Sequence, residues 1–218
     1  MATAAVIILR TFVVQVYGVT TPSMAGTLRP GDYVMTSNAV FGPRVPLVHR
    51  RLPAFRGPRH GEVVVFDEGR PGAGPAVIKR IIGVPGDTLQ MIDRTMLRNG
   101  RLLRERYLAA PSTADERLEL DGPLGVRWHL EALPAGASPA VYEPSRDTWG
   151  PLVVPAGHYF VMGDNRDWSV DSRVAGFIAR SRIRGKVLAI YYSADPASTR
   201  PFPRAVTALR PRRIGRVR

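Results

Sequence analysis

Short apolar runs separated by proline and glycine turns dominate this chain and restrict it to a fold made mainly of β-strands. Residues Phe12–Val19 are mostly β-branched and aromatic and show no helical period. Comparable runs lie at Tyr33–Met35, Glu62–Phe66, Val77–Val84, Thr88–Ile92, Tyr159–Met162 and Lys186–Tyr192. The Asn99-Gly100 pair between apolar flanks is typical of a two-residue hairpin turn. With 21 glycines and 20 prolines among 218 residues, long helices are disfavoured.

The chain is long enough for one substantial core with a smaller inserted lobe. We expect the main β domain to comprise residues 11–93 and 151–193. Residues 94–150 are more polar and lack strong strand runs, which predicts an inserted smaller lobe. Residues 43–59 are basic and rich in proline and are expected to form a surface loop, and residues 194–218 a basic C-terminal tail.

The N-terminus carries an uncharged, mostly apolar run, Ala2–Leu9, that stops at Arg10. A helix that crosses a bilayer needs about 20 apolar residues, so this run is less than half of one. It is compatible with a buried first strand or helix, and also with the last turns of a membrane helix. We expect residues 1–10 to be the remnant of an N-terminal transmembrane segment.

The formal net charge of +13 indicates that the protein binds an anionic partner or lies at an anionic surface. Residues Arg200–Arg218 contain seven arginines and no acidic residue. Tails of this kind bind nucleic acid or anionic lipid headgroups, and a solvated arginine-rich surface is the third possibility. Composition alone does not choose between them.

The absence of cysteine excludes disulfides, thiolate catalysis and cysteine-based metal sites. The four histidines are His49, His60, His129 and His158, and none has the spacing or the glutamate partner of a metalloprotease helix. We therefore expect no metal and no cofactor, which leaves serine, threonine, lysine and carboxylates as candidate nucleophiles.

Lysine is rare in this chain, because only Lys79 and Lys186 stand against 29 arginines. Burial can lower the pKa of a lysine until it serves as a general base, whereas arginine stays protonated in proteins. If Val77–Val84 is a strand, Lys79 and Arg80 point to opposite faces, so one of them can enter a cavity while the other meets solvent. Lys186 precedes an apolar strand and is expected to be an ordinary surface lysine.

Two further segments could supply chemistry. Ser23 follows a proline and precedes small residues, which suits an exposed hydroxyl, although an ordinary turn has the same composition. Residues Gly163–Arg173 concentrate charge beside an apolar strand, which predicts an ion-paired and hydrogen-bonded loop.

Together, the three segments resemble the signature boxes of bacterial type I signal peptidases, also called leader peptidases. Thr21-Pro22-Ser23-Met24 through Gly31-Asp32 resembles the nucleophile box. Lys79-Arg80 with Gly83-Val84-Pro85-Gly86-Asp87 resembles the base box, and Gly163–Arg173 resembles the third and most specific box. The resemblance extends over about residues 11–192 and is weakest at 101–148. It implies a signal-peptidase-like β catalytic domain and a serine endopeptidase with a Ser-Lys dyad.

The resemblance also implies roles for individual residues. Ser23 would be the acyl-forming nucleophile and Lys79 its general base. The Ser23 N–H and the Thr21 hydroxyl would form the oxyanion hole. Ser169 would orient the lysine, with Asp171 and Arg173 as a supporting ion pair and Asp164 bracing the same loop. Pockets for small substrate side chains would be shaped by Val19, Met24, Leu28, Val77 and Ile78.

By the same resemblance, the substrates would be preproteins cut after small residues at A-x-A-like sites. The enzyme would lie in the inner, cytoplasmic membrane with its catalytic domain on the outer side, in contact with anionic phospholipid. No nucleic-acid partner is expected. Gly26 stands where the family usually has proline, a change expected to loosen the turn after the nucleophile.

Three alternatives compete with this interpretation. A self-cleaving repressor-type protease also uses a Ser-Lys dyad but needs a DNA-binding domain upstream, and only 22 residues precede Ser23. A non-catalytic, arginine-rich nucleic-acid-binding β-protein predicts aromatic residues among the basic ones, and the tail has only Phe202. A signal-peptidase-like protease with a specialised substrate remains open.

Overall fold

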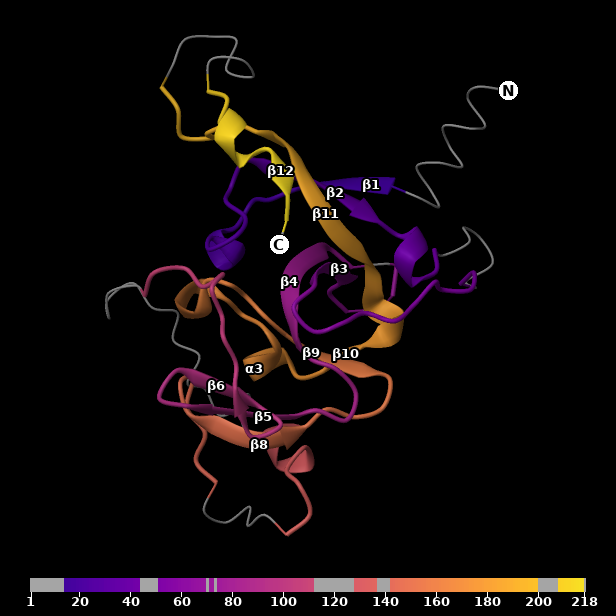
Figure 1. The fold of residues 1–218 in the computed structure, drawn as a ribbon, viewed down its shortest axis with the longest axis vertical. Coiled ribbons are helices and arrows are strands. Elements are labelled where there is room, and N and C mark those ends of the chain that lie inside the picture. The colour runs from indigo at the N-terminus through magenta and orange to yellow at the C-terminus, as the bar shows by residue number, and fades with distance from the viewer. Residues whose placement is uncertain are drawn as a thin grey trace.

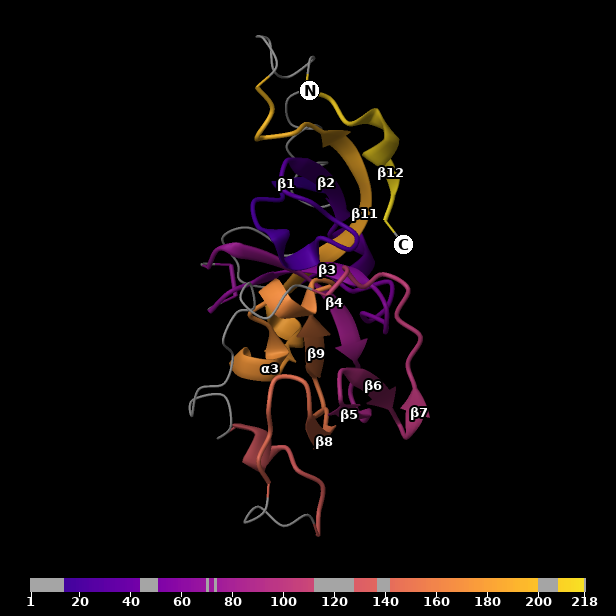
Figure 2. The same cartoon turned by 90° about the vertical axis from the view of Figure 1, so that its left-hand side faces the viewer.

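A computed structural model of the protein describes residues 14–43, 51–69, 71–72, 74–111, 128–136, 142–199 and 208–217. The expected membrane remnant at residues 1–10 lies outside these ranges. Within them, no helix is both long and apolar enough to span a bilayer. The described chain forms two antiparallel sheets, one toward each end of the molecule in Figure 1, and the view turned by 90° in Figure 2 separates them again.

The larger sheet has eight strands in the order β1-β2-β11-β3-β4-β9-β10, with β12 paired to β11. These strands are β1 Val14–Gly18, β2 Asp32–Ser37, β3 Val63–Asp67, β4 Ala76–Gly83, β9 His158–Met162, β10 Ile178–Ala179, β11 Ile183–Ser193 and β12 Gly215–Arg216. The smaller sheet has the order β7-β6-β5-β8, with β5 Thr88–Ile92, β6 Thr95–Arg98, β7 Arg101–Leu102 and β8 Trp149–Val153.

All seven runs predicted as strands are strands, with ends shifted by a few residues. The Asn99-Gly100 turn between β6 and β7 is confirmed, since both residues have the positive φ, 53° and 72°, that this hairpin turn requires. β6, β7, β8, β10 and β12 were not predicted, because they are short or contain polar residues or proline. The limits 94–150 for an inserted lobe stay a prediction, because part of that range is not described.

Three apolar clusters form the core. One lies at the smaller sheet around Leu89, Trp149 and Phe160. A second contains Val19, Met24 and Leu28 together with valines of the larger sheet, so the nucleophile box is anchored by its own apolar residues. A third surrounds Phe41 and Val161. The short helical elements are α3 Ser172–Ala175 and the 3-10 turns η1 Pro22–Met24, η2 Ala39–Phe41, η5 Arg166–Trp168, η6 Arg180–Arg182 and η7 Pro211–Arg213.

The C-terminal residues 208–217 fold back onto the larger sheet through the pairing of β12 with β11. The Arg213 guanidinium donates to both carboxylate oxygens of Asp32, with Nε 2.9 Å from Oδ1 and Nη2 2.5 Å from Oδ2. Arg210 contacts the same carboxylate, which is fully buried. Burial opposes the charge on Asp32, but these and other hydrogen bonds outweigh it and lower its pKa. Two arginines of the predicted basic tail therefore hold the turn that follows the nucleophile box.

Candidate active site

Ser23 lies in η1, a single 3-10 turn that begins with a proline. Pro22 favours an extended residue before it, and Thr21 has φ −115° and ψ 153°. Met24 and Leu28 hold the turn in the core, and the Leu28 N–H donates to the Met24 carbonyl at 2.6 Å. Ser23 remains 8% exposed, and its Oγ lies 3.1 Å from Oγ1 of Thr21. The turn thus presents one hydroxyl beside another.

Lys79 lies on β4 opposite Val64 of β3 and is 4% exposed. No hydrogen bond or ion pair joins its amine to any other residue in the described ranges. Burial lowers the pKa of Lys79; the Asp171 carboxylate opposes this shift and the Arg173 guanidinium adds to it. A buried lysine without a carboxylate partner therefore loses its proton at a lower pH than a surface lysine does.

The expectation that one of the two side chains of Lys79 and Arg80 meets solvent is wrong, because Lys79 is only 4% exposed and Arg80 only 1%. Both faces of β4 are covered from Lys79 onward, so alternation does not lead to water. The Arg80 guanidinium binds Asp164 with two hydrogen bonds, Nε to Oδ1 at 2.8 Å and Nη2 to Oδ2 at 2.7 Å. It also donates to Thr27 Oγ1 at 2.9 Å. Arg80 therefore joins the base strand to the two other boxes.

Residues Gly163–Arg173 form a loop that is fixed by buried hydrogen bonds. The Arg173 guanidinium binds Asp171 through Nε to Oδ1 and Nη2 to Oδ2, both at 2.9 Å. Asp171 also accepts from the Gly163 N–H at 3.0 Å. Burial opposes the charge on Asp171, but the Arg173 cation and these hydrogen bonds lower its pKa, so the pair stays charged.

Ser169 is fully buried, and its Oγ has no hydrogen-bond partner among the described residues. A buried hydroxyl without a partner is costly, so this group is available to bind an approaching donor or acceptor. Gly163 marks where the loop meets the nucleophile turn. A Cβ at Gly163 would lie 2.3 Å from Ser169 Oγ and 2.5 Å from the Ser23 carbonyl oxygen. Only glycine lets Ser23 and Ser169 approach the same point.

A groove of about 580 Å³ brings the candidate residues together. It is lined by the hydroxyl residues Thr20, Thr21 and Ser23, by Lys79 and Glu68, and by apolar and aromatic side chains. Four of the five predicted pocket residues line it: Val19, Met24, Val77 and Ile78. Leu28, the fifth, is fully buried in the core cluster behind the turn and is not among the lining residues. Ser169 and the Asp171–Arg173 pair lie behind the groove rather than in its wall.

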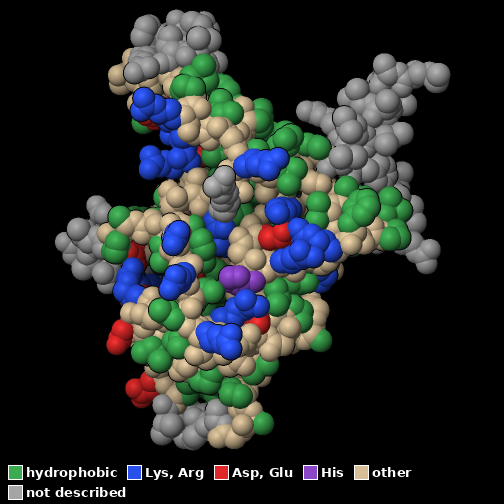
Figure 3. Space-filling view, viewed as in Figure 1, with side chains coloured by type: hydrophobic (Ala, Val, Ile, Leu, Met, Phe, Trp, Pro, Cys, Tyr) green, Lys and Arg blue, Asp and Glu red, His purple; other side chains and the backbone are tan. Residues whose placement is uncertain are grey.

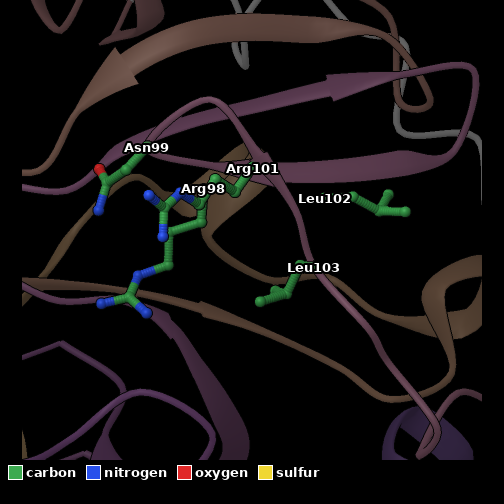
Figure 4. A pocket seen from close by; sticks show the side chains of 5 residues that line it. All are labelled: Arg98, Asn99, Arg101, Leu102 and Leu103. Carbon is green, nitrogen blue, oxygen red and sulfur yellow. The ribbon is translucent and has the colours of Figure 1, made fainter.

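Another hollow, of about 400 Å³, lies beside the β6–β7 hairpin and is lined by Arg98, Asn99, Arg101, Leu102 and Leu103 (Figure 4). Arg98 and Asn99 both donate to Asp87, at 2.7 and 2.8 Å. These contacts fix the hairpin onto the Pro85-Gly86-Asp87 turn. Its lining contains no hydroxyl, lysine or carboxylate, so it offers no nucleophile.

Sequence reasoning missed the structural parts played by Thr27 and Gly163. Thr27 Oγ1 donates to Asp164 at 2.5 Å while accepting from Arg80, so it lies between two buried charges. Thr27 lies in the nucleophile box and Gly163 begins the third box. Their positions in these boxes were the sequence features that could have indicated a structural role.

The sequence profile of the family described as "Signal peptidase, peptidase S26" matches residues 1–192. The chain belongs to this family. A signal peptidase I of Pseudomonas aeruginosa is 33% identical over 206 residues, covering 88% of this chain and 69% of the relative. A signal peptidase I of Pseudomonas fluorescens is 33% identical over 202 residues, covering 86% and 68%. A signal peptidase I of Bacillus licheniformis is 30% identical over 193 residues, covering 88% and 84%.

Membership in the signal peptidase family gives the chain its function. The chain has the function of a signal peptidase I, a serine endopeptidase that cleaves signal peptides from preproteins. The groove passes between the Tyr17–Met24 segment and β4. On the face of the molecule shown in Figure 3, Lys and Arg side chains are numerous and Asp and Glu side chains are few.

Proposed function

We propose that Ser23 and Lys79 form the catalytic dyad of this signal peptidase. One observation carries the assignment: the Ser23 hydroxyl and the Lys79 amine line the same groove, and the lysine is buried without a carboxylate partner. Its lowered pKa favours the neutral amine that a general base requires. Lys186, by contrast, pairs with Glu62 at 2.9 Å and remains 30% exposed, as expected of a structural surface lysine.

In the proposed mechanism, the neutral Lys79 amine takes the proton from Ser23 Oγ as that oxygen attacks the scissile carbonyl carbon. The Ser23 N–H and the Thr21 hydroxyl donate to the oxyanion of the tetrahedral intermediate. When the intermediate collapses, the Lys79 ammonium returns the proton to the leaving amine of the mature protein. Lys79 then deprotonates a water, which hydrolyses the acyl-enzyme ester and frees Ser23.

Ser169 is proposed to orient the Lys79 amine, because its buried hydroxyl lacks a partner in the described structure. The Asp171–Arg173 pair and Asp164 fix the loop that carries Ser169. Val19, Met24, Val77 and Ile78 are proposed to limit the substrate to small side chains near the cut, because they line the groove with apolar surface. Cleavage after A-x-A-like sites is proposed on the family resemblance, and a groove lined by these residues is compatible with it.

The assignment is tested with detergent-solubilised enzyme and a preprotein that carries an A-x-A site. Ser23→Ala should lower kcat/KM by at least about a thousandfold, because loss of a nucleophile costs several decades. Ser181→Ala, at an exposed serine in η6, is the matched control and should cleave normally. Retention of more than about a thousandth of wild-type activity by Ser23→Ala would show that the nucleophile lies elsewhere.

We also propose that the enzyme works at an anionic membrane, the cytoplasmic membrane with the catalytic domain on its outer side. The net charge of +13 favours anionic headgroups. Trp168 and Val170, which line the groove, are 38% and 54% exposed and could contact lipid beside a bound signal peptide. In flotation, vesicles with anionic lipid should bind the protein and release it in high salt. Binding that ignores both lipid charge and salt would contradict this proposal.

A further inference from the structure

The segment Glu105–Ala109, here called the strap, crosses directly over the turn that follows Ser23. A Cβ at Gly26 would lie 1.9 Å from the Tyr107 carbonyl oxygen and 2.7 Å from the Ala109 nitrogen. These are backbone atoms, so no side-chain rotation relieves the clash. Gly26 therefore makes room for the strap, and the proline usual in the family would collide with it. The expectation that Gly26 loosens the turn stays a prediction.

The strap also contacts the base strand. The Tyr107 ring lies under the Arg80 guanidinium, with Cζ 3.9 Å from the ring centroid. The Tyr107 hydroxyl donates to Glu105 at 2.7 Å, which fixes the ring in this position. Arg80 is adjacent to Lys79 and binds Asp164, so the strap packs against the cation that links β4 to the third box.

A third set of contacts joins the strap to the Gly163–Arg173 loop. The Ala109 N–H donates to the Asp164 carbonyl at 2.9 Å. Glu105 forms a buried ion pair with Arg166, whose Nε donates to the Gly163 carbonyl at 3.2 Å. The strap therefore contacts the nucleophile turn, the base strand and the loop that carries Ser169. None of its residues is among those that line the groove.

We propose that the strap Glu105–Ala109 is a positioning element that sets the relative placement of Ser23, Lys79 and Ser169. The proposal rests on the assignment of Ser23 and Lys79 given above. Because no residue of the strap lines the groove, we expect it to act on the alignment of the reacting groups and not on the contact with substrate. Its loss should therefore lower kcat and leave KM nearly unchanged, since small misplacements of reacting groups are costly.

The test compares Gly26→Ala with Gly57→Ala in the signal-peptide cleavage assay. At Gly57 a Cβ would meet only Tyr159 Oη, at an ordinary 3.6 Å, so this variant should behave as wild type. Gly26→Ala should lower kcat by about tenfold to a hundredfold with KM within about twofold. Thermal melting shows the folded fraction, to which each rate is normalised. A normal kcat in folded Gly26→Ala, or a rise in KM alone, would overturn the proposal.

A second pair of variants decides the matter if Gly26→Ala does not fold. Tyr107→Phe keeps the ring under Arg80 and loses only the hydrogen bond to Glu105, whereas Tyr107→Ala loses both. Tyr107→Ala should show the fall in kcat, and Tyr107→Phe should retain most of the activity. Equal kcat in the two variants would contradict a positioning role. An active Ser23→Ala variant would instead refute the dyad itself, so the two failures are distinguishable.

Discussion

Strand β4 buries two consecutive cationic side chains, Lys79 and Arg80, on its two opposite faces, and within the described part of the chain only Arg80 is paired with other residues. On one face, Arg80 is held by two hydrogen bonds from its guanidinium to Asp164 and by the Tyr107 ring. On the other face, Lys79 lines the groove and has no hydrogen-bond or ion-pair partner among the described residues. A fully paired cation contributes structure, whereas an unpaired one is destabilised in its charged form. The contrast separates a structural charge from a candidate base.

The largest effect should come from exchanging the chemistry of the two cations. Lys79→Arg keeps the charge, but the guanidinium cannot release a proton at a workable pH. We expect Lys79→Arg and Lys79→Ala to lose kcat/KM equally, by at least about a thousandfold, in the cleavage assay. Substantial activity in Lys79→Arg would make Lys79 a structural cation and would end the contrast between the two faces.

Stability should change in opposite directions when each cation is made apolar. Arg80→Met leaves Asp164 buried and unpaired, which should cost about 3–5 kcal/mol in the free energy of unfolding. Lys79→Met removes an unpaired buried amine and should be neutral or stabilising. Chemical denaturation measures both, and Arg80→Met combined with Asp164→Leu should recover part of the loss. If Lys79→Met lowers the free energy of unfolding more than Arg80→Met does, the assignment of Arg80 as the structural cation is contradicted.

The pH dependence of stability should sharpen the same comparison. Because burial lowers the pKa of Lys79 in the folded state, the unfolded chain binds more protons between the folded and unfolded pKa values. Wild-type stability should therefore rise with pH across this interval, up to the unfolded value of about 10.4. Lys79→Met should lack this rise. Denaturation at several pH values measures the free energy of unfolding of both proteins. If this free energy depends on pH in the same way in wild type and Lys79→Met, the pKa of Lys79 is not lowered.

The smallest effect is expected at Lys186, which serves as the control lysine. Its pair with Glu62 is partly exposed, and such pairs contribute about 0–1 kcal/mol. Lys186→Met should unfold within about 1 kcal/mol of wild type and cleave the preprotein at the same rate. A drop in kcat/KM comparable with that of Lys79→Ala would mean that the two lysines do not divide into base and surface cation.

The sequence was sufficient to predict seven of the twelve strands in the described chain and to single out the three boxes, because both depend on local patterns. The burial of Arg80 was missed because alternation along a strand does not reveal that both faces are covered. The strap was missed because Glu105–Ala109 has no strand or helix pattern. Its contacts with Gly26 and Arg166 join residues that are far apart in the sequence, so no local pattern predicts them. The Asp32–Arg213 contact joins residues 181 positions apart, which no local pattern shows.

The central claim is that Lys79 titrates below the ordinary lysine value, and the scarcity of lysine makes it directly measurable. Protein grown with lysine isotope-labelled at Cε should give two NMR resonances, one for each of the two lysines. Lys186→Arg removes one of them and assigns the other to Lys79. We predict that the Lys79 resonance shifts with pH along a single ionisation below about 10.4. If the Lys79 resonance shows no ionisation below about 10.4, Lys79 has an ordinary lysine pKa and the account is contradicted.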